Sequence, residues 1–257
     1  ARPLSEAMAL RYQVYCEEFE YLPAGDYPAG LECDEDDSRA AHFHLFDRRT
    51  LDASEPTVTG WDGSARGALA GYVRLVRPDA HDLLPVQRRC QLTLDDGARP
   101  TPSLSAEVSR LITAPEFRRN GRNRSSGRQA SGQTSDTQLL PTEILLHLFR
   151  QMLSYSRSNG IRYWFAAMER PLARSLSQMG FPFKAAGPEG EFFGRVTPYV
   201  ADLNDLQHRV ATSQPGLAPW LLAPEVEDGH FPDTTPSSFA PVWARRPPPP
   251  QLWRAAC

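Results

Sequence analysis

Residues 107–114 read Glu-Val-Ser-Arg-Leu-Ile-Thr-Ala, a short run rich in β-branched residues that predicts a β-strand. Two upstream runs, HFHLF at 42–46 and LAGYVRLVR at 69–77, have the same character and predict two more strands. Downstream, IRYWFAAM at 161–168 and EFFGRVTPYVADL at 191–203 predict the last two. The chain is therefore expected to fold around a sheet.

Helices are predicted on either side of these strands. Apolar residues recur at helical spacing over residues 4–20 and 139–159. A shorter helix is predicted at 171–181, with a proline in its first turn and Gly180 at its end. Because strands and helices do not alternate regularly, the order favours a mixed α/β (α+β) fold.

Two segments lie outside this core pattern. A polar, arginine-rich and Gly/Ser-rich stretch is expected to form a basic mobile loop at 118–137. After residue 213 the chain turns proline-rich, which disfavours helix and sheet. We therefore predict one domain at 1–213 and an extension at 214–257. Aromatic residues of the extension are expected to pack over the domain: Trp220, Phe239 and Trp243.

Composition narrows the classes of protein that fit. The net charge of −3 gives no overall reason to expect nucleic-acid binding, and no apolar run is long enough for a membrane span. The first residues lack a signal-peptide pattern, so the expected location is the cytoplasm. Four cysteines are scattered without a CxxC pair, which argues against a disulfide framework and a zinc site.

Residues 32–37, Glu-Cys-Asp-Glu-Asp-Asp, form the most informative polar motif. The carboxylates of Glu32, Asp34 and Asp37, together with downstream arginines, suggest a site for a small cationic substrate. A purely structural ion-pair network is the alternative interpretation.

The order of the charged motifs resembles that of a known superfamily. Arg11, the Glu32-x-Asp34-x-x-Asp37 run, a Gly71-x-x-Arg74 strand and a Glu107-x-x-Arg110 strand resemble acyl-homoserine-lactone synthases of the LuxI type. These belong to the GNAT acyltransferase superfamily, as do N-acyl amino acid synthases of the FeeM type. Across roughly residues 8–203, the segments RYQVYCEEFEYL, DYPAGLECDEDD, GYVRLVRP and EVSRLI look most like acyltransferases associated with PEP-CTERM/exosortase systems. That group is regarded as N-acyl amino acid synthases.

The resemblance implies a GNAT-like fold, a mixed and mostly antiparallel sheet flanked by helices. It implies an enzyme that moves a fatty acyl group from an acyl carrier protein thioester, or from acyl-CoA, to the α-amine of an amino acid. No bound cofactor or metal, no nucleic acid and no integral membrane segment are expected. Two alternatives stay open: an autoinducer synthase that acylates S-adenosylmethionine, and a noncatalytic acyl-binding module.

The resemblance also assigns roles to residues. Glu107 is the expected proton acceptor, with Arg110 beside it. The expected substrate-binding residues are Arg11, Glu32, Asp34, Asp37 and Arg74. The expected acyl-donor residues are Leu111, Ile112, Thr113, Arg118, Arg119, Gly121 and Arg122. The chain departs from the GNAT pattern at the phosphate loop, which reads Arg118-x-x-Gly121-x-Asn123, and at Leu176, where many relatives have a tyrosine general acid.

Overall fold

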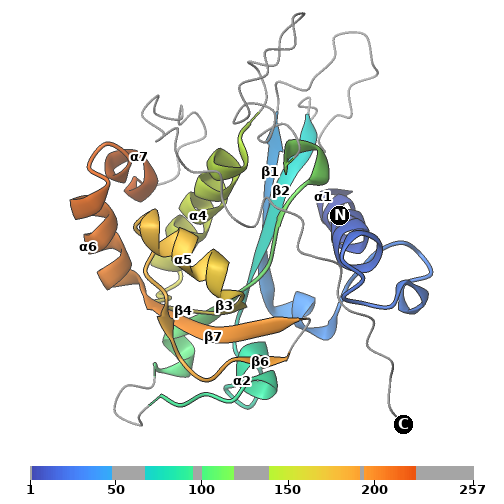
Figure 1. Ribbon diagram of the computed structural model, residues 1–257, viewed down its shortest axis with the longest axis horizontal. Coiled ribbons are helices and arrows are strands. Elements are labelled where there is room, and N and C mark those ends of the chain that lie inside the picture. The colour runs from blue at the N-terminus through green and yellow to red at the C-terminus, as the bar shows by residue number, and fades with distance from the viewer. Residues whose placement is uncertain (1, 48–66, 95–99, 119–138, 192–193, 224–257) are drawn as a thin grey trace, which may run out of the picture.

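Figure 1 shows the computed structural model, which describes residues 2–47, 67–94, 100–118, 139–191 and 194–223. The expected mobile loop at 118–137 and most of the extension at 214–257 lie outside these ranges, with Arg118 and residues 214–223 as the described parts.

The centre of the described chain is one mixed β-sheet. Its strands are β1 Ala40–Asp47, β2 Ala68–Val76, β3 Ser105–Thr113, β4 Tyr163–Met168, β5 Lys184–Ala185, β6 Gly190–Glu191 and β7 Arg195–Asp202. They lie in the order β1-β2-β3-β4-β7-β5, with β6 paired to β7. Only the β3–β4 pairing is parallel among these strands, so the mostly antiparallel sheet predicted from the sequence is confirmed.

Helices flank the sheet on both sides (Figure 1). They are α1 Arg2–Tyr12, α2 Pro85–Arg89, α4 Pro141–Ser158, α5 Arg170–Gln178, α6 Leu203–Ser213 and α7 Ala218–Leu222. Within the described residues, a π-helical segment, η1 Gln13–Glu18, and three 3₁₀ turns accompany them: η2 Ala24–Asp26, η3 Glu35–Arg39 and η6 Pro102–Leu104. Helices α4 to α7 lie on one side of the sheet in this view, and α1 lies on the other.

Helix α6 was not predicted from the sequence, although the sequence contains the signals of a helix there. Asp202 caps the helix by accepting a hydrogen bond from the backbone N–H of Asn204 at 2.9 Å. Leu203, Leu206 and Val210 then bury one helical face. Because β7 runs directly into α6, no glycine or proline separates the two patterns.

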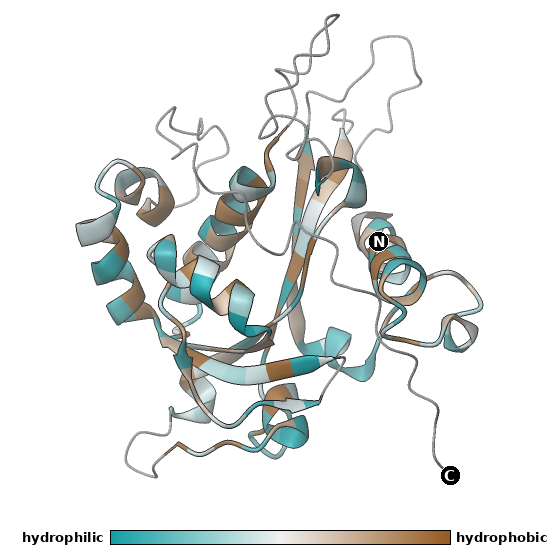
Figure 2. Cartoon of the chain, in the orientation of Figure 1, coloured by the Kyte–Doolittle hydropathy of each residue, from teal (hydrophilic) through white to brown (hydrophobic). Residues whose placement is uncertain are grey.

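Helix α4 forms the centre of the core through its apolar face. Ile144, Leu148, Phe149 and Met152 are fully or almost fully buried. Figure 2 shows α4 banded in brown and teal, as expected for a helix with one face on the sheet. Close packing against β2 is possible because residue 71 is glycine: a Cβ there would lie 2.5 Å from Cγ2 of Ile144.

The parallel strands β3 and β4 pair only at their beginnings. Their register runs from Ser105↔Tyr163 to Glu107↔Phe165, whereas β3 continues to Thr113 and β4 to Met168. Beyond Glu107 the two strands therefore part, while β3 stays paired with β2. This opening divides the sheet into two halves.

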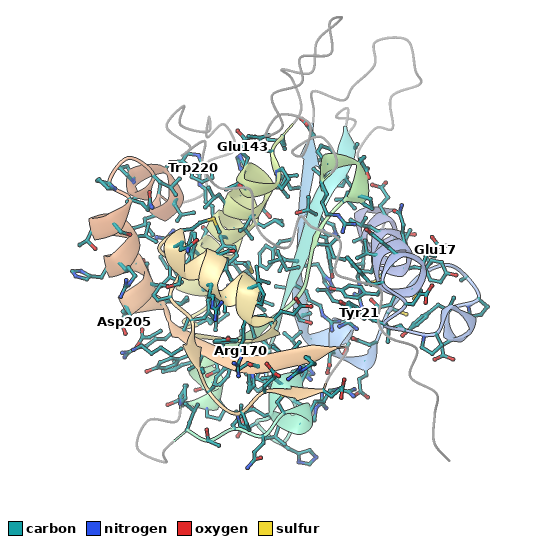
Figure 3. All side chains as sticks on the ribbon, in the orientation of Figure 1. Glu17, Tyr21, Glu143, Arg170, Asp205 and Trp220 are labelled. Atoms are coloured by element: carbon teal, nitrogen blue, oxygen red, sulfur yellow. The ribbon has the colours of Figure 1, made fainter. Side chains whose placement is uncertain are left out.

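Helix α7 packs against α4, although the sequence favoured an extended segment here. The rings of Trp220 and His147 meet edge to face, with their centroids 4.9 Å apart. The guanidinium carbon of Arg150 lies 4.8 Å from the centroid of the Trp220 ring. Figure 3 shows Trp220 beside α4. The predicted packing through Trp220 is thus present, whereas Phe239 and Trp243 lie outside the described residues, and the boundary at residue 213 remains a prediction.

The contact at Gly71 gives a test of this packing. Gly71→Ala is expected to lower the free energy of unfolding by about 1–3 kcal/mol, because the added methyl group overlaps Ile144. Gly25→Ala is the matched control, since a Cβ at Gly25 meets no atom within 4 Å. Urea unfolding of both variants measures the difference. Equal stability of the two would contradict this seating of α4 on β2.

Candidate functional site

The acidic motif folds into a capped turn that directs its carboxylates toward the sheet. Asp34 precedes η3, and its carboxylate accepts a hydrogen bond from the backbone N–H of Asp36 at 3.1 Å. Asp37 reaches back to accept from the backbone N–H of Asp34 at 2.8 Å. These reciprocal bonds fix the turn and hold Asp34 and Asp37 on one side of it.

The turn meets three arginines in a buried group of ion pairs, which we call the charge cluster. Its members are Arg11, Arg74, Arg110, Glu32, Asp34 and Asp37. They come from α1, the loop before η3, η3 itself, β2 and β3. Three positive and three negative charges balance one another, as buried ionic groups require.

Arg74 and Asp34 form the best-aligned pair of the cluster. Nη1 and Nη2 of Arg74 donate to the two carboxylate oxygens of Asp34 at 2.6 and 2.8 Å. Nη1 also donates to Asp37 at 2.5 Å. This fork-to-fork geometry is the strong form of an arginine–carboxylate interaction.

Glu32 is shared by two arginines at the most buried end of the cluster. Arg110 donates to both of its oxygens at 3.1 and 2.9 Å, and Nε of Arg11 donates to it at 2.5 Å. Arg11 also donates to Asp37 at 2.7 Å. Arg11 and Glu32 are 0% exposed, so each depends on the other for its charge to be tolerated.

The arginines lower the pKa of all three carboxylates. Burial alone would raise the pKa of Asp34, but hydrogen bonds and charge from Arg74 outweigh it and lower the pKa to about 2. The pKa values of Glu32 and Asp37 are lowered against burial in the same way, chiefly through Arg11. All three are therefore ionised at neutral pH.

Arg110 reaches the cluster because the strand is irregular at this point. Its φ is +56°, in the left-handed region that costs a non-glycine residue energy. The β2–β3 register passes from Arg74↔Ser109 to Tyr72↔Ile112, so β3 has an extra residue here. Ser109, 3.4 Å from Arg74, and its neighbour Arg110 consequently reach the same group of charges, which consecutive residues of a regular strand do not.

Glu107 has a different environment from the cluster. Its carboxylate accepts a hydrogen bond from the backbone N–H of Val86, at the start of α2, at 2.6 Å. Burial raises the pKa of Glu107 to about 7, although this hydrogen bond and the charge of Arg74 act to lower it. Glu107 therefore has the pKa of a group that can exchange a proton near neutral pH.

The family comparison agrees with this fold. Residues 10–125, which include the charge cluster, match the family described as an acetyltransferase (GNAT) domain. Over residues 10–125 the chain is thus similar to GNAT-type acetyltransferase domains, and it is an acyltransferase. The fold and the enzyme class predicted from the sequence are confirmed.

Solved structures share the GNAT-type fold at low sequence identity. BjaI, a CoA-dependent acyl-homoserine lactone synthase solved with SAM and isopentyl-CoA, is 16% identical; the match covers 90% of this chain and 88% of BjaI with a TM-score of 0.53. The AHL synthase LasI is 16% identical over 82% of this chain and 88% of LasI, with a TM-score of 0.52. FeeM, an N-acyl amino acid synthase from uncultured soil microbes, is 14% identical; the match covers 81% of this chain and 94% of FeeM with a TM-score of 0.43. No curated protein matches the sequence.

The predicted acyl-donor residues of the GNAT-type domain separate into two groups. Ile112 and Thr113 continue β3 beyond the point where β4 leaves it, and they pair with β2. Arg118 forms an ion pair with Glu18 and lies 5.5 Å from the centroid of the Phe19 ring. The remaining residues of the predicted phosphate loop lie outside the described residues: Arg119, Gly121 and Arg122.

Two residues beside the cluster were not predicted as site residues. Tyr72 lies two residues before Arg74 on β2, and its hydroxyl is 2.7 Å from Nδ1 of His42. Among the described residues, no group of three or more His, Cys, Asp or Glu side chains is arranged to hold a metal ion. The residue spacing along β2 was the available signal for Tyr72, since i and i+2 share a face.

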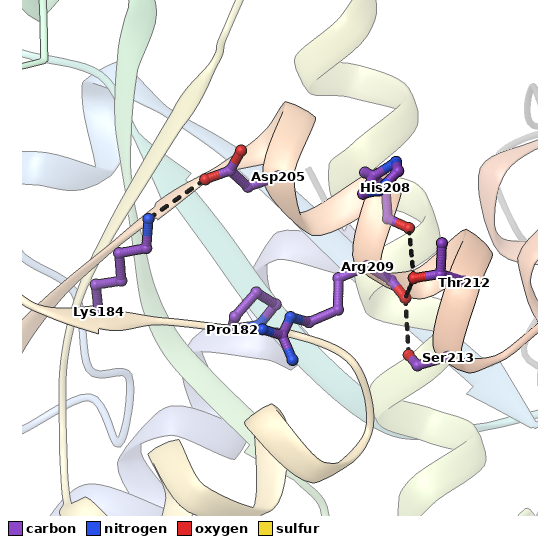
Figure 4. A pocket seen from close by; sticks show the side chains of 7 residues that line it. All are labelled: Pro182, Lys184, Asp205, His208, Arg209, Thr212 and Ser213. Carbon is purple, nitrogen blue, oxygen red and sulfur yellow. Dashed lines mark hydrogen bonds and ion pairs between the residues drawn. The ribbon is translucent and has the colours of Figure 1, made fainter.

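A surface hollow lies at the other edge of the sheet (Figure 4). Lys184 pairs with Asp205 at 3.3 Å there, and the hydroxyls of Thr212 and Ser213 donate to carbonyls of α6. Strands β4 and β7 separate β5 from the strands of the charge cluster. The hollow is therefore distinct from the candidate site.

No helix among the described ranges is both long and apolar enough to span a membrane.

Removing one carboxylate tests the cluster. Asp34→Asn is expected to lower the free energy of unfolding at pH 7 by about 2–4 kcal/mol, because Arg74 loses the carboxylate that pairs with both of its Nη atoms and keeps only Asp37. The stabilisation by Asp34 is complete above about pH 4 and is lost as the pH falls through its folded pKa of about 2. The difference between parent and variant should therefore shrink in urea unfolding experiments near pH 2.

Glu35→Gln, on the same turn, is the control for Asp34→Asn. The Glu35 side chain is 77% exposed and lies 3.7 Å from Arg88. Its replacement should change stability by less than about 0.5 kcal/mol. A loss as large as that of Asp34→Asn would show that the turn, rather than the buried pairing, is the source of the effect.

The raised pKa of Glu107 predicts that the stability contributed by this residue falls, rather than rises, with increasing pH. Its folded pKa is raised to about 7, so the folded protein keeps this proton while the unfolded chain releases it near pH 4.5. Stability should therefore fall by about 3 kcal/mol between those pH values. Glu107→Gln removes this decrease, and its stability relative to the parent should rise from pH 4 to pH 8. Parallel curves for the two proteins in urea unfolding would show an ordinary carboxyl.

Proposed function

We propose that this chain is an N-acyltransferase that moves a fatty acyl group from an acyl carrier protein thioester to the α-amine of an amino acid. The observation that carries the proposal is Glu107, a buried carboxyl with a pKa of about 7 at the place where β3 and β4 part. An amine is a nucleophile only when it is neutral, so a base matched to neutral pH is what the reaction needs.

The proposed step is direct attack of the amine on the thioester carbonyl. The carbon–nitrogen bond forms, and the proton of the attacking amine passes to Glu107. The carbon–sulfur bond breaks, and the carrier leaves as a thiolate that takes its proton from solvent. Backbone N–H groups of Leu111, Ile112 and Thr113 are proposed to stabilise the oxyanion. No side-chain nucleophile is required, and Leu176, which is buried in the core, is not proposed as an acid.

The charge cluster is proposed to hold the acceptor next to Glu107. Asp34 is the most exposed of its carboxylates, at 26% of the side chain, and is the proposed ligand of the substrate ammonium. The other carboxylates serve mainly to keep the arginines in place. The ion pairs thus support both the fold and the proposed binding site.

The finer likeness of the sequence to exosortase-associated acyltransferases favours an amino acid as the acceptor. Acylation of SAM, as in an autoinducer synthase, is the second candidate, since the same charge cluster suits another amine that carries a carboxylate. Acyl-CoA is the alternative donor. We propose a cytoplasmic location, which suits the scattered cysteines.

Mass spectrometry of lipid extracts tests the proposal. Cells that produce the parent protein should contain new N-acyl amino acids, whereas cells that produce Glu107→Gln should not. Glu35→Gln, on the exposed side of η3, is expected to behave as the parent. Acyl-homoserine lactones would instead identify SAM as the acceptor. No new lipid with any of the three proteins would favour the noncatalytic module.

Purified protein gives the sharper measurement. With acyl carrier protein thioester and the amino acid identified in cells, Glu107→Gln should lower kcat by about 10²–10⁴-fold and still bind the acyl donor. The parent's activity should rise with pH through about 7 as Glu107 ionises. A pH-independent rate in this range would exclude Glu107 as the base.

A further inference from the structure

His42 contacts the charge cluster from the edge strand β1. It is paired in register with Arg74 on β2. Both nitrogens of its ring have partners: Nδ1 lies 2.7 Å from the Tyr72 hydroxyl, and Nε2 lies 3.1 Å from the backbone carbonyl oxygen of Asp37. A histidine bound at both nitrogens has a fixed ring orientation.

These contacts determine the positions of the protons. A backbone carbonyl only accepts hydrogen bonds, so Nε2 of His42 carries a proton and donates it to Asp37. In the neutral ring Nδ1 is then an acceptor, and the Tyr72 hydroxyl donates to it. Burial raises the pKa of Tyr72 to about 12, against the lowering effects of Arg11 and Arg74, so this hydroxyl keeps its proton at neutral pH.

Asp37 is the residue through which His42 reaches the arginines. One oxygen of its carboxylate accepts from both Arg11 and Arg74, at 2.7 and 2.5 Å. Its other oxygen accepts from the backbone of Asp34. A small shift of the Asp37 backbone would therefore disturb both arginines and the turn together.

We propose that His42, supported by Tyr72, is a positioning residue that fixes Asp37 and so shapes the acceptor side of the site. The proposal rests on the proposed N-acyltransferase function. His42 is not proposed to touch the reacting atoms, and it acts only through the backbone of Asp37. Its loss is therefore expected to affect acceptor binding much more than acyl-donor binding.

Two substitutions separate the two hydrogen bonds of His42. Glutamine places an amide N–H where Nε2 lies, so His42→Gln can still donate to Asp37. Asparagine is shorter and places its amide near Nδ1, so His42→Asn can meet Tyr72 but not Asp37. Tyr72→Phe removes only the hydroxyl that holds the ring.

Steady-state kinetics of these variants test the proposal. We expect His42→Asn to raise the acceptor KM about 10-fold with the donor KM unchanged, the size of effect that one lost hydrogen bond gives. His42→Gln should stay within about 2-fold of the parent, and Tyr72→Phe should fall between them. An unchanged acceptor KM in His42→Asn, or an equal rise in both KM values, would overturn the proposal. So would equal effects of asparagine and glutamine.

A second measurement does not depend on the reaction. The pKa of Asp37 is lowered, against burial, by its hydrogen bond with Arg11 and by the charges of Arg11 and Arg74. If His42 positions Asp37, a carbon-13 NMR titration should show the Asp37 pKa rising toward its ordinary value in His42→Asn but not in His42→Gln. An unchanged pKa in both would overturn the positioning role. If the parent forms no amide and this NMR difference appears, the proposed function fails while the positioning role stands.

Discussion

Burial of charge is the constraint on which this structure depends. Arg11 and Glu32 are completely removed from solvent, and Arg74 is almost so. Ionised groups in such a place are tolerated only if each has an opposite charge and its hydrogen bonds are satisfied. The chain meets this requirement by bringing α1, the acidic turn, β2 and β3 to one place. The position of α1 against the sheet and the shape of the η3 turn are thereby linked to the geometry of the site.

The irregular features of β3 follow from the same requirement. Glu107 and Arg110 are three residues apart, and a regular strand would point them to opposite faces. The left-handed backbone of Arg110 and the extra residue in the register remove that alternation. Arg110 then meets Glu32, while Glu107 is held by the N–H of Val86. The two groups of this short motif therefore share a face of the strand but keep different partners: Arg110 stays ionised, and Glu107 can titrate near neutral pH.

Much of the fold could be predicted from the sequence, because its strands and long helices have strong local patterns. HFHLF and LAGYVRLVR became β1 and β2, and the stripe of apolar residues after Leu139 became α4. Helix α2 is too short to show a helical repeat of apolar residues. Helix α6 was not predicted because it follows β7 directly, with no glycine or proline to mark the change. The meeting of Arg11, Asp34 and Arg110 was indicated by the order of motifs. The partner of each charge, the bulge at Arg110 and the two contacts of His42 depend on packing between distant segments, which no local pattern encodes.

The charge cluster also has a consequence for the order of folding. Its contacts join residues far apart in the sequence, with separations of 21 between Arg11 and Glu32, 40 between Arg74 and Asp34, and 78 between Arg110 and Glu32. The contacts of Arg74 and Arg110 close larger loops than the β1–β2 pairing, whose partners are 21 to 36 residues apart, so they are expected to form after that pairing has organised the sheet. Interactions made late on the folding path chiefly determine how fast the native state opens. The cluster is therefore expected mainly to slow unfolding, so that it sets the lifetime of the assembled site more than the speed of its assembly.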